Sequence, residues 1–212
     1  MARARSDSPE AVKAEGAASA GTLDELARDI ARCRGCPLWA NATQAVPGEG
    51  ARGARVMLVG EQPGDQEDLA GKPFVGPAGK LLDRALVEAG IDRRQVFVTN
   101  AVKHFSWIPR GKRRLHKKPS DREVAACMDW LRAEIRLVRP DVIVCLGATA
   151  AHALLGPGVK VTVERGRFLE SPLGARVLVS VHPSSILRGD PDDRARAFAA
   201  FVSDLKRIGD AH

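Results

Sequence analysis

Four short runs of apolar residues constrain the fold of this chain more than any other feature of its sequence. They are rich in Val, Ile and Leu and read VMLVGEQ (56 to 62), VFVTNAV (96 to 102), VIVCLG (142 to 147) and VLVSVHP (177 to 183). Because each run is continuous rather than alternating, both faces of the strand are expected to be buried. The runs therefore predict strands of a parallel sheet that helices cover on both sides.

The segments between these runs carry the periodicity and the end signals of helices. Ser120 and Glu123 form a capping box ahead of a long apolar stripe, and other segments stop at a glycine or begin at a proline. The expected helices start at Thr22, span 79–90, span 120–138, span 149–155 and run from Pro191 to about Ile208. Strands alternating with helices predict an α/β fold, a three-layer α/β/α domain around a central, mainly parallel four-stranded sheet.

The length and composition favour one domain. A chain of 212 residues that is 44% hydrophobic can bury the core of one ordinary domain. Residues 1–21 offer no apolar face, which predicts a disordered tail followed by a single domain over 22–212. No run approaches the ~18 apolar residues that a membrane span needs. The start of the chain also lacks the apolar stretch of a secretion signal, so we expect a soluble, cytoplasmic protein without membrane contact.

Positive charge is concentrated in the segment RGKRRLHKKP (110–119). The formal net charge of the chain is +7, and this segment carries six Lys and Arg and no acid. Such a concentration favours a local contact with a polyanion such as nucleic acid. The alternative is a solvated or localisation patch in which His116 is incidental.

Polar side chains follow the ends of the predicted strands. Glu61 and Gln62 end the first, Asn100 the second, Gly147 the third and His182 the fourth. In open α/β sheets ligands bind in the crevice beyond the carboxyl ends of the strands. We therefore expect a binding site at this edge. The sequence GEQPGD is not GxGxxG, which disfavours a dinucleotide site.

Two further segments belong to this expected site. The loop GEQPGDQEDLAGKPFVG (60–76) offers polar groups to a flat ligand, although its alternative role is a solvated connection. Within it, Phe74 offers a stacking face for a base or packs in the core. The segment VHPSSILR (181–188) adds His182, two hydroxyls and Arg188, which is suited to a phosphate.

The cysteines leave several chemistries open. Cys33 and Cys36 form a CxxC motif, which is compatible with redox, zinc and iron–sulfur chemistry. Cys127 lies on a predicted helix, whereas Cys145 lies in an apolar run and is expected to be a core residue. His104 can supply a fourth ligand. Its alternative is an ordinary surface or core histidine.

Several blocks, in order, closely resemble the signature of the iron–sulfur uracil-DNA glycosylases of family 4, across about residues 25 to 208. The blocks are GEQPGDQEDLAGKPFVGPAGKLLDRAL, VTNAVKH, VCLGATAA and VHPSSILR. Two departures, VKHFSW in place of the usual VKCRPP and the insertion GKRRLHKKP, resemble the UdgX branch of these enzymes. In that branch the histidine of a KRRIH-type loop becomes covalently joined to the abasic sugar. Here Leu115 replaces the Ile of that loop.

The resemblance implies a role for each candidate residue. A 4Fe-4S cluster is expected on Cys33, Cys36, His104 and Cys127. The expected catalytic residues are His116, Glu61 and His182, and the uracil-binding residues are Gln62, Gly64, Asp65, Phe74, Asn100 and His182. The expected DNA-binding residues are Lys112, Arg113, Arg114, Lys117, Lys118, Ser184 and Arg188.

The resemblance implies that the lone imidazole of the basic segment is a nucleophile. Breaking the glycosidic bond leaves positive charge at C1′ of the sugar, and a neutral His116 in place of the attacking water would capture it. A free imidazole has a pKa of ~6.5, and the neighbouring cations Arg113, Arg114, Lys117 and Lys118 are expected to disfavour its protonation. Glu61 is expected to accept the proton or to fix the tautomer.

Three hypotheses of different classes follow. The preferred one is a DNA-repair enzyme that excises uracil and ends covalently attached to DNA through His116. The second is a turnover glycosylase that releases abasic DNA, and the third is a non-catalytic nucleic-acid-binding module with a Cys/His metal site. The expected partner is uracil-containing DNA, preferably single-stranded, bound by a monomer associated with a bacterial nucleoid.

Overall fold

The computed structural model describes residues 17–211 and contains the predicted parallel sheet. The four apolar runs form β1 (Val56–Gly60), β2 (Val96–Asn100), β5 (Val142–Leu146) and β7 (Arg176–Ser180). They are mutually parallel in the order β2-β1-β5-β7. Their carboxyl ends therefore lie at one edge, where Gly60 is in register with Asn100.

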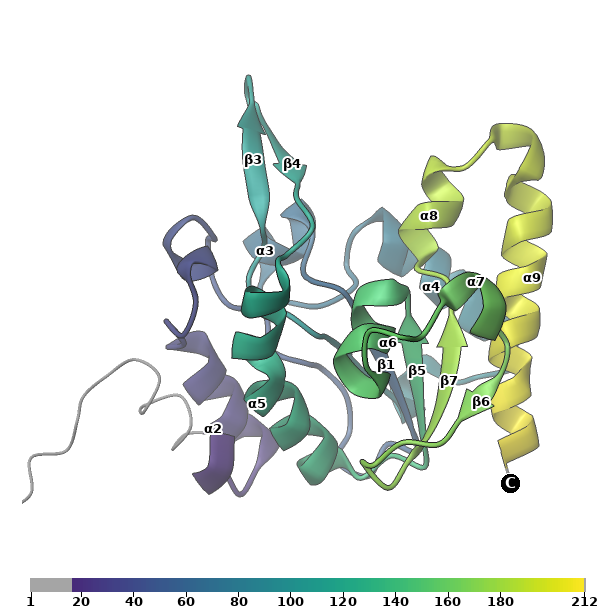
Figure 1. Cartoon of the computed structure of the whole chain (residues 1–212), viewed down its shortest axis with the longest axis horizontal. Helices are drawn as coiled ribbons and strands as arrows, with labels where there is room; N and C mark the ends of the chain where they lie inside the picture. Colours follow the sequence, from purple (N-terminus) through teal and green to yellow (C-terminus); the bar gives the residue numbers. More distant parts are fainter. Residues whose placement is uncertain (1–16, 212) are drawn as a thin grey trace, which may run out of the picture.

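Successive residues of the strands pack on opposite faces of the sheet, which gives the three predicted layers (Figure 1). Leu58 and Val144 pack with α4 (Pro77–Glu88) and α9 (Arg194–Lys206). Met57 and Ile143 pack on the other side with α5 (Asp121–Val138) and α6 (Ala148–Leu155). The helix α2 (Leu23–Ala31) lies against α5 through a third apolar cluster that includes Trp130. The α/β/α fold class is thus confirmed.

The sheet has a fifth strand that was not predicted. β6 (Phe168–Leu169) pairs antiparallel with β7 at the edge of the sheet. Two residues are too few to show a period in the sequence, so the expected four-stranded sheet was one strand short.

The predicted helix ends are largely confirmed. Thr22 with Glu25 and Ser120 with Glu123 each form a capping box. The last predicted helix is divided into η3 (Pro191–Asp193), α9 and η4 (Arg207–Ala211). The remaining short helices, which were not expected, are η1 (Pro37–Ala40), α3 (Asp65–Ala70), η2 (Arg93–Gln95), α7 (Val161–Glu164) and α8 (Pro183–Arg188).

The basic segment is a β-hairpin rather than a loop. β3 (Trp107–Arg110) pairs antiparallel with β4 (Arg113–His116), and the hairpin projects from the body beside α3 (Figure 1). Two residues connect the strands, and the first, Gly111, has a φ of 57° that suits a tight hairpin turn. The hairpin puts His116 at the end of β4, opposite Trp107.

The amino-terminal part of the chain is described only from residue 17. The sequence predicts a disordered tail over residues 1–21. Residues 1–16 of this tail lie outside the described residues. Ala17 and Ala20 are buried against α2 and α5, and Arg136 donates hydrogen bonds to both of their carbonyl groups. Ala17 and Ala20, within the predicted tail, are therefore packed against the domain. Among the helices of residues 17–211, none has the length and apolar character needed to cross a bilayer.

Candidate active site

A pocket of about 670 Å³ opens at the carboxyl edge of the sheet. Its lining comes from the segments after β1, β2, β5 and β7, from the hairpin and from α3, α4 and α8. It gathers these predicted site residues: Glu61, Gln62, Gly64, Asp65, Phe74, Asn100, His116, His182, Ser184 and Arg188. The edge that sequence reasoning selected is therefore the edge that carries the cavity.

Glu61 connects the hairpin to the sheet. Its Oε1 atom lies 3.3 Å from Nε2 of His116, and its Oε2 accepts a short hydrogen bond from the hydroxyl of Thr149. Thr149 is buried in the first turn of α6, after the strand β5. The carboxylate is thus fixed on one side and faces the imidazole on the other, which suits it to hold or accept a proton.

The pKa of His116 lies below its ordinary value of 6.5, as predicted, but the main cause differs from the prediction. Burial is the largest contribution, the nearby Arg188 adds to it, and the Glu61 carboxylate opposes it. The positive charge that lowers the pKa of His116 is therefore that of Arg188 in α8, and not that of the hairpin's own cations. The imidazole is favoured in its neutral, nucleophilic form.

His182 has a defined tautomer. The backbone N–H of Ser184 donates to Nδ1 of His182 at 3.2 Å, so Nδ1 is the acceptor nitrogen and the neutral ring carries its proton on Nε2. Burial lowers the pKa of His182 to about 4, and Arg188 and His116 add to the effect. A neutral ring with a fixed N–H donor can stabilise negative charge on a leaving base.

Phe74 and Asn100 meet above Gly60. A Cβ atom at Gly60 would lie 2.3 Å from Oδ1 of Asn100 and 2.8 Å from Cζ of Phe74, so only glycine fits there. Phe74 is buried at a positive φ of 57°, and its ring stacks on that of His182 with centroids 6.1 Å apart. In the described part of the chain no residue bonds to the side-chain amide of Asn100. That amide and the Phe74 ring are available to a planar ligand.

Gln62 and Arg114 attach the hairpin to the body. Gln62 donates to the carbonyl groups of Ser106 and Lys117, at 3.1 Å each, and accepts from the N–H of Ser106 at 3.0 Å. Arg114 donates to Asp65 and to the fully buried Asp68, at 2.6 Å each. Gln62 was expected to bind uracil and Arg114 to bind DNA. Their observed contacts hold the strand that ends at His116, and Gln62 also lines the pocket.

The other predicted DNA-binding residues are mostly solvent-exposed. Lys112, Arg113, Lys117 and Lys118 are exposed on and just after the hairpin, and Arg188 is exposed at the pocket. Ser184 differs, because its hydroxyl lies 2.8 Å from Nδ1 of His182. Asp65, expected to bind uracil, lies at the rim and pairs with Arg114.

The four expected cluster ligands are all buried and lie outside this pocket. A hydrogen bond from Cys127, followed by one from His104, lowers the pKa of Cys36 to about 5. Cys33 accepts a hydrogen bond from Nε1 of Trp130 at 3.1 Å. Cys145 is buried in β5 among apolar side chains, as predicted.

Three cysteines and a histidine are residue types that hold iron–sulfur clusters, and Cys36 lies within hydrogen-bond reach of both Cys127 and His104. Within residues 17–211, no three His, Cys, Asp or Glu side chains converge as one metal ion would require. In a four-iron cluster each iron takes one protein ligand. Nδ1 of His104 is buried and lacks a hydrogen-bond partner in the described structure, which leaves it available for such a bond.

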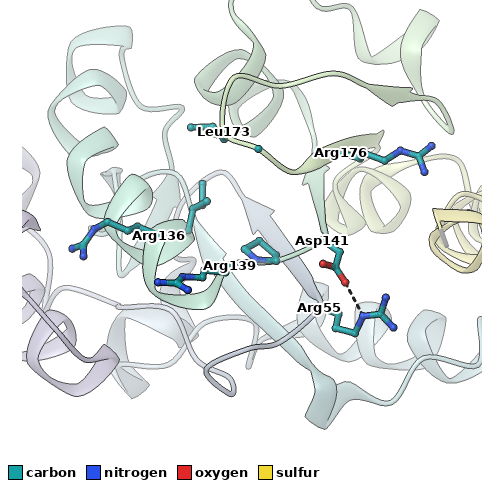
Figure 2. Close-up of a pocket in the computed structure, with 9 residues that line it drawn as sticks. Arg55, Arg136, Arg139, Asp141, Leu173 and Arg176 are labelled. Carbon is teal, nitrogen blue, oxygen red and sulfur yellow. Dashed lines mark hydrogen bonds and ion pairs between the residues drawn. The ribbon is translucent and has the colours of Figure 1, made fainter.

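A second pocket, of about 570 Å³, lies at the amino ends of the strands and holds none of the predicted residues. Four arginines contribute to its lining. Figure 2 shows Arg136 and Arg139 pointing to one side and Arg55 and Arg176 to the other, and Arg55 pairs with Asp141 at 2.7 Å. The guanidinium groups therefore do not converge on one ligand position.

Sequence reasoning missed two residues that hold parts of the pocket in place. Thr149 was expected only as part of a helix, yet it holds Glu61. Glu67 accepts from the N–H groups of Gly64 and Gly76, at 3.1 and 2.8 Å, and closes the segment around Phe74. Both stand in the blocks GEQPGDQED and LGATAA. Their place in the segments that follow β1 and β5 was the available signal.

The fold and the pocket define the class: an α/β/α protein with a pocket at the carboxyl ends of its strands, lined by a carboxylate and two histidines. The family model described as the uracil DNA glycosylase superfamily matches residues 47–206. The chain therefore belongs to the uracil DNA glycosylase superfamily.

Individual relatives indicate which types of uracil-DNA glycosylase the chain is similar to. The chain is 38% identical over 185 residues to a type-4 uracil-DNA glycosylase of Thermotoga maritima, which covers 87% of this chain and 93% of the relative. It is 35% identical over 196 residues to a type-4 enzyme of Archaeoglobus fulgidus, covering 89% and 92%. A type-5 uracil-DNA glycosylase of Pyrobaculum aerophilum is 29% identical over 198 residues, covering 78% and 84%. An iron–sulfur cofactor is consistent with the type-4 relationship.

Proposed function

We propose that this protein is a uracil-DNA glycosylase of DNA repair that becomes covalently linked, through His116, to C1′ of the abasic sugar. Its membership of the superfamily and its type-4 relatives support the excision of uracil from DNA. The observation that carries the covalent step is the position of His116, which lines the base pocket 3.3 Å from Glu61.

The base is held by stacking and by directional hydrogen bonds. Phe74 supplies the stacking face, and the Asn100 amide, which can both donate and accept, reads N3–H and O4 of uracil against the cytosine pattern. Nε2–H of neutral His182 donates to a uracil carbonyl oxygen. As the glycosidic bond breaks, its electron pair leaves with uracil, and this donor stabilises the resulting anion.

His116 then takes the place of water. A ring nitrogen of the neutral imidazole donates its electron pair to C1′ and forms a new N–C bond. The alkylated ring carries one positive charge until the proton on its other nitrogen is lost. Glu61 accepts that proton or holds the tautomer that attacks. The bound imidazole is a poor leaving group once neutral, so the adduct persists.

The hairpin supplies both the nucleophile and the DNA contact. Its exposed cations, Lys112, Arg113, Lys117 and Lys118, meet backbone phosphates, and Arg188 does so from the other side of the pocket. Because the target base must leave its stack, a strand that is already single should react faster. We propose that the protein acts as a monomer on such DNA in the bacterial cytoplasm, at the nucleoid.

The cluster has a structural role in this proposal. Excision involves no electron transfer, so a 4Fe-4S cluster on Cys33, Cys36, His104 and Cys127 would tie α2, α5 and the segment after β2 together. Cys36→Ser should lower the iron content per protein and the melting temperature. Cys145→Ser, at a buried cysteine that is not an expected ligand, should leave the iron content unchanged. Equal iron in wild type and Cys36→Ser would contradict the ligand assignment.

A denaturing gel tests the function. The protein is mixed with a labelled uracil oligonucleotide, single- or double-stranded, beside His116→Ala. A slow band that requires both uracil and His116 supports the covalent enzyme. Abasic product in excess over enzyme, without a slow band, would indicate the turnover glycosylase. No loss of uracil at all would indicate the non-catalytic module.

A further inference from the structure

Lys103 is a fully buried lysine that lies behind the base pocket. Its Nζ atom donates at 2.7 Å to Oε2 of Glu134, at 2.7 Å to the hydroxyl of Thr99 and at 2.8 Å to the backbone carbonyl of Asn100. An ammonium group has three N–H donors, so all three are used. Lys103 does not line the pocket, yet it bonds directly to the backbone of a residue that does.

Glu134 is equally well satisfied. Its side chain is 2% exposed, its Oε1 accepts from the N–H of Gly48 at 2.8 Å, and its Oε2 accepts from Lys103 and Thr99. The ion pair therefore joins α5, the segment before β1 and the end of β2. A fully bonded pair of this kind permits one arrangement of the groups around it.

Stability alone does not account for this ion pair. Taking two charges out of water is costly, and an apolar pair of similar size is often as stable. An apolar pair would lack every hydrogen bond of this ion pair. Among these bonds, the one from Lys103 to the carbonyl of Asn100 is made to a residue that lines the pocket. It falls where β2 ends and the chain turns away from the sheet.

We propose that Lys103 is a positioning residue that orients Asn100 toward uracil. The Asn100 amide has no bonding partner in the described part of the chain, so its orientation depends on the backbone that carries it. Gly60 limits that backbone in front, since Oδ1 would lie only 2.3 Å from a Cβ atom there. Lys103 holds it from behind through the carbonyl group.

This inference rests on the proposed function and deepens it. Discrimination of uracil from cytosine requires the donor and the acceptor of one amide to face the correct atoms of the base. A backbone that can rotate at Asn100 loses this alignment while the pocket stays intact. Lys103 thus affects base recognition without touching the base.

The test separates positioning from folding with three variants. Lys103→Met leaves Glu134 unpaired, Glu134→Gln keeps Lys103 with its bond to Asn100, and the double variant removes both charges. Binding of free uracil is measured by calorimetry, and the melting temperature is measured beside it. Lys103→Met and the double variant should each bind uracil about tenfold more weakly, which is the loss of one well-placed hydrogen bond.

Uracil affinity and melting temperature should change independently of each other across the three variants. The double variant should melt at a higher temperature than Lys103→Met and still bind weakly, whereas Glu134→Gln should melt lower than wild type and bind uracil within about twofold of it. Wild-type affinity in the double variant would overturn the proposal. Failure of the wild-type protein to bind or excise uracil would instead overturn the proposed function.

Discussion

Nε2 of His116 lies 3.3 Å from Oε1 of Glu61, although the hairpin and the first strand of the sheet carry these two residues separately. Both residues line the pocket in which the Asn100 amide and the Phe74 ring are available to a base. The proposed nucleophile and its proposed proton acceptor therefore line the same pocket as the groups proposed to hold the base.

Removing the Glu61 carboxylate should slow formation of the adduct. Glu61→Gln keeps the shape of the side chain but cannot accept a proton, and we expect the single-turnover rate to fall about 100-fold. Thr149→Val loses the hydroxyl that holds Glu61 and should cost less than about tenfold. The rates are read from the covalent band on a denaturing gel. A Glu61→Gln rate equal to wild type would remove Glu61 from the mechanism.

The rate of adduct formation should fall only on the acid side of pH 6.5. Burial and Arg188 hold the pKa of His116 below 6.5, so the imidazole is neutral at pH 7 and becomes protonated, and inactive as a nucleophile, only at lower pH. Arg188→Ala removes a like charge and should move the acid limb of the profile to higher pH. A pH–rate profile of both proteins checks the sign. An acid limb that does not move would exclude Arg188 as a cause.

Loss of the Arg114 side chain should lower the rate of adduct formation more than the rate of uracil excision. Arg114→Met frees β4 from α3 and also leaves the carboxylate of Asp68 buried and unpaired, at a cost of about 3 kcal/mol in the free energy of unfolding. Adding Asp68→Asn should restore stability but not the adduct rate. Lys112→Met, on the exposed turn of the same hairpin, is the matched control and at saturating DNA should leave both the stability and the ratio of adduct to excised uracil unchanged. Equal loss of excision and adduct in Arg114→Met would argue against a role in holding His116.

The salt dependence of DNA binding should separate exposed cations from paired ones. Each phosphate contact contributes about 0.7 to 0.9 to the slope of log K against log salt. Replacing Lys112, Arg113, Lys117 or Lys118 by Ala should reduce the magnitude of this slope by at most about 0.7 to 0.9, the contribution of one phosphate contact. Arg114→Ala should leave the slope nearly unchanged, because its guanidinium is held by two carboxylates. Fluorescence anisotropy over a range of salt concentrations measures both.

The sheet and its functional edge could be predicted because their signals are local. Each core strand is a continuous apolar run, and Glu61, Asn100 and His182 lie at or just after the ends of three of these strands. In a parallel sheet, residues that end different strands must lie at one edge. The grouping of these side chains in one pocket therefore followed from the order of the elements.

The hairpin and its attachment could not be predicted in this way. β3 and β4 are largely charged or exposed, so their sequence shows no alternation of apolar and polar residues, and only Gly111 marks the turn. Bonds from Gln62 and from the carboxylates of Asp65 and Asp68 hold the hairpin. These are contacts between residues far apart in the chain, which no local pattern reveals. The same reason hid Arg188 as the like charge that acts on His116.

The mass of the intact protein after complete removal of uracil from a short oligonucleotide tests the covalent claim most directly. Wild type should gain the mass of the abasic oligonucleotide, one per protein, and His116→Ala should gain none. Complete uracil release with only unmodified wild-type protein in the spectrum would contradict the account and leave ordinary hydrolysis.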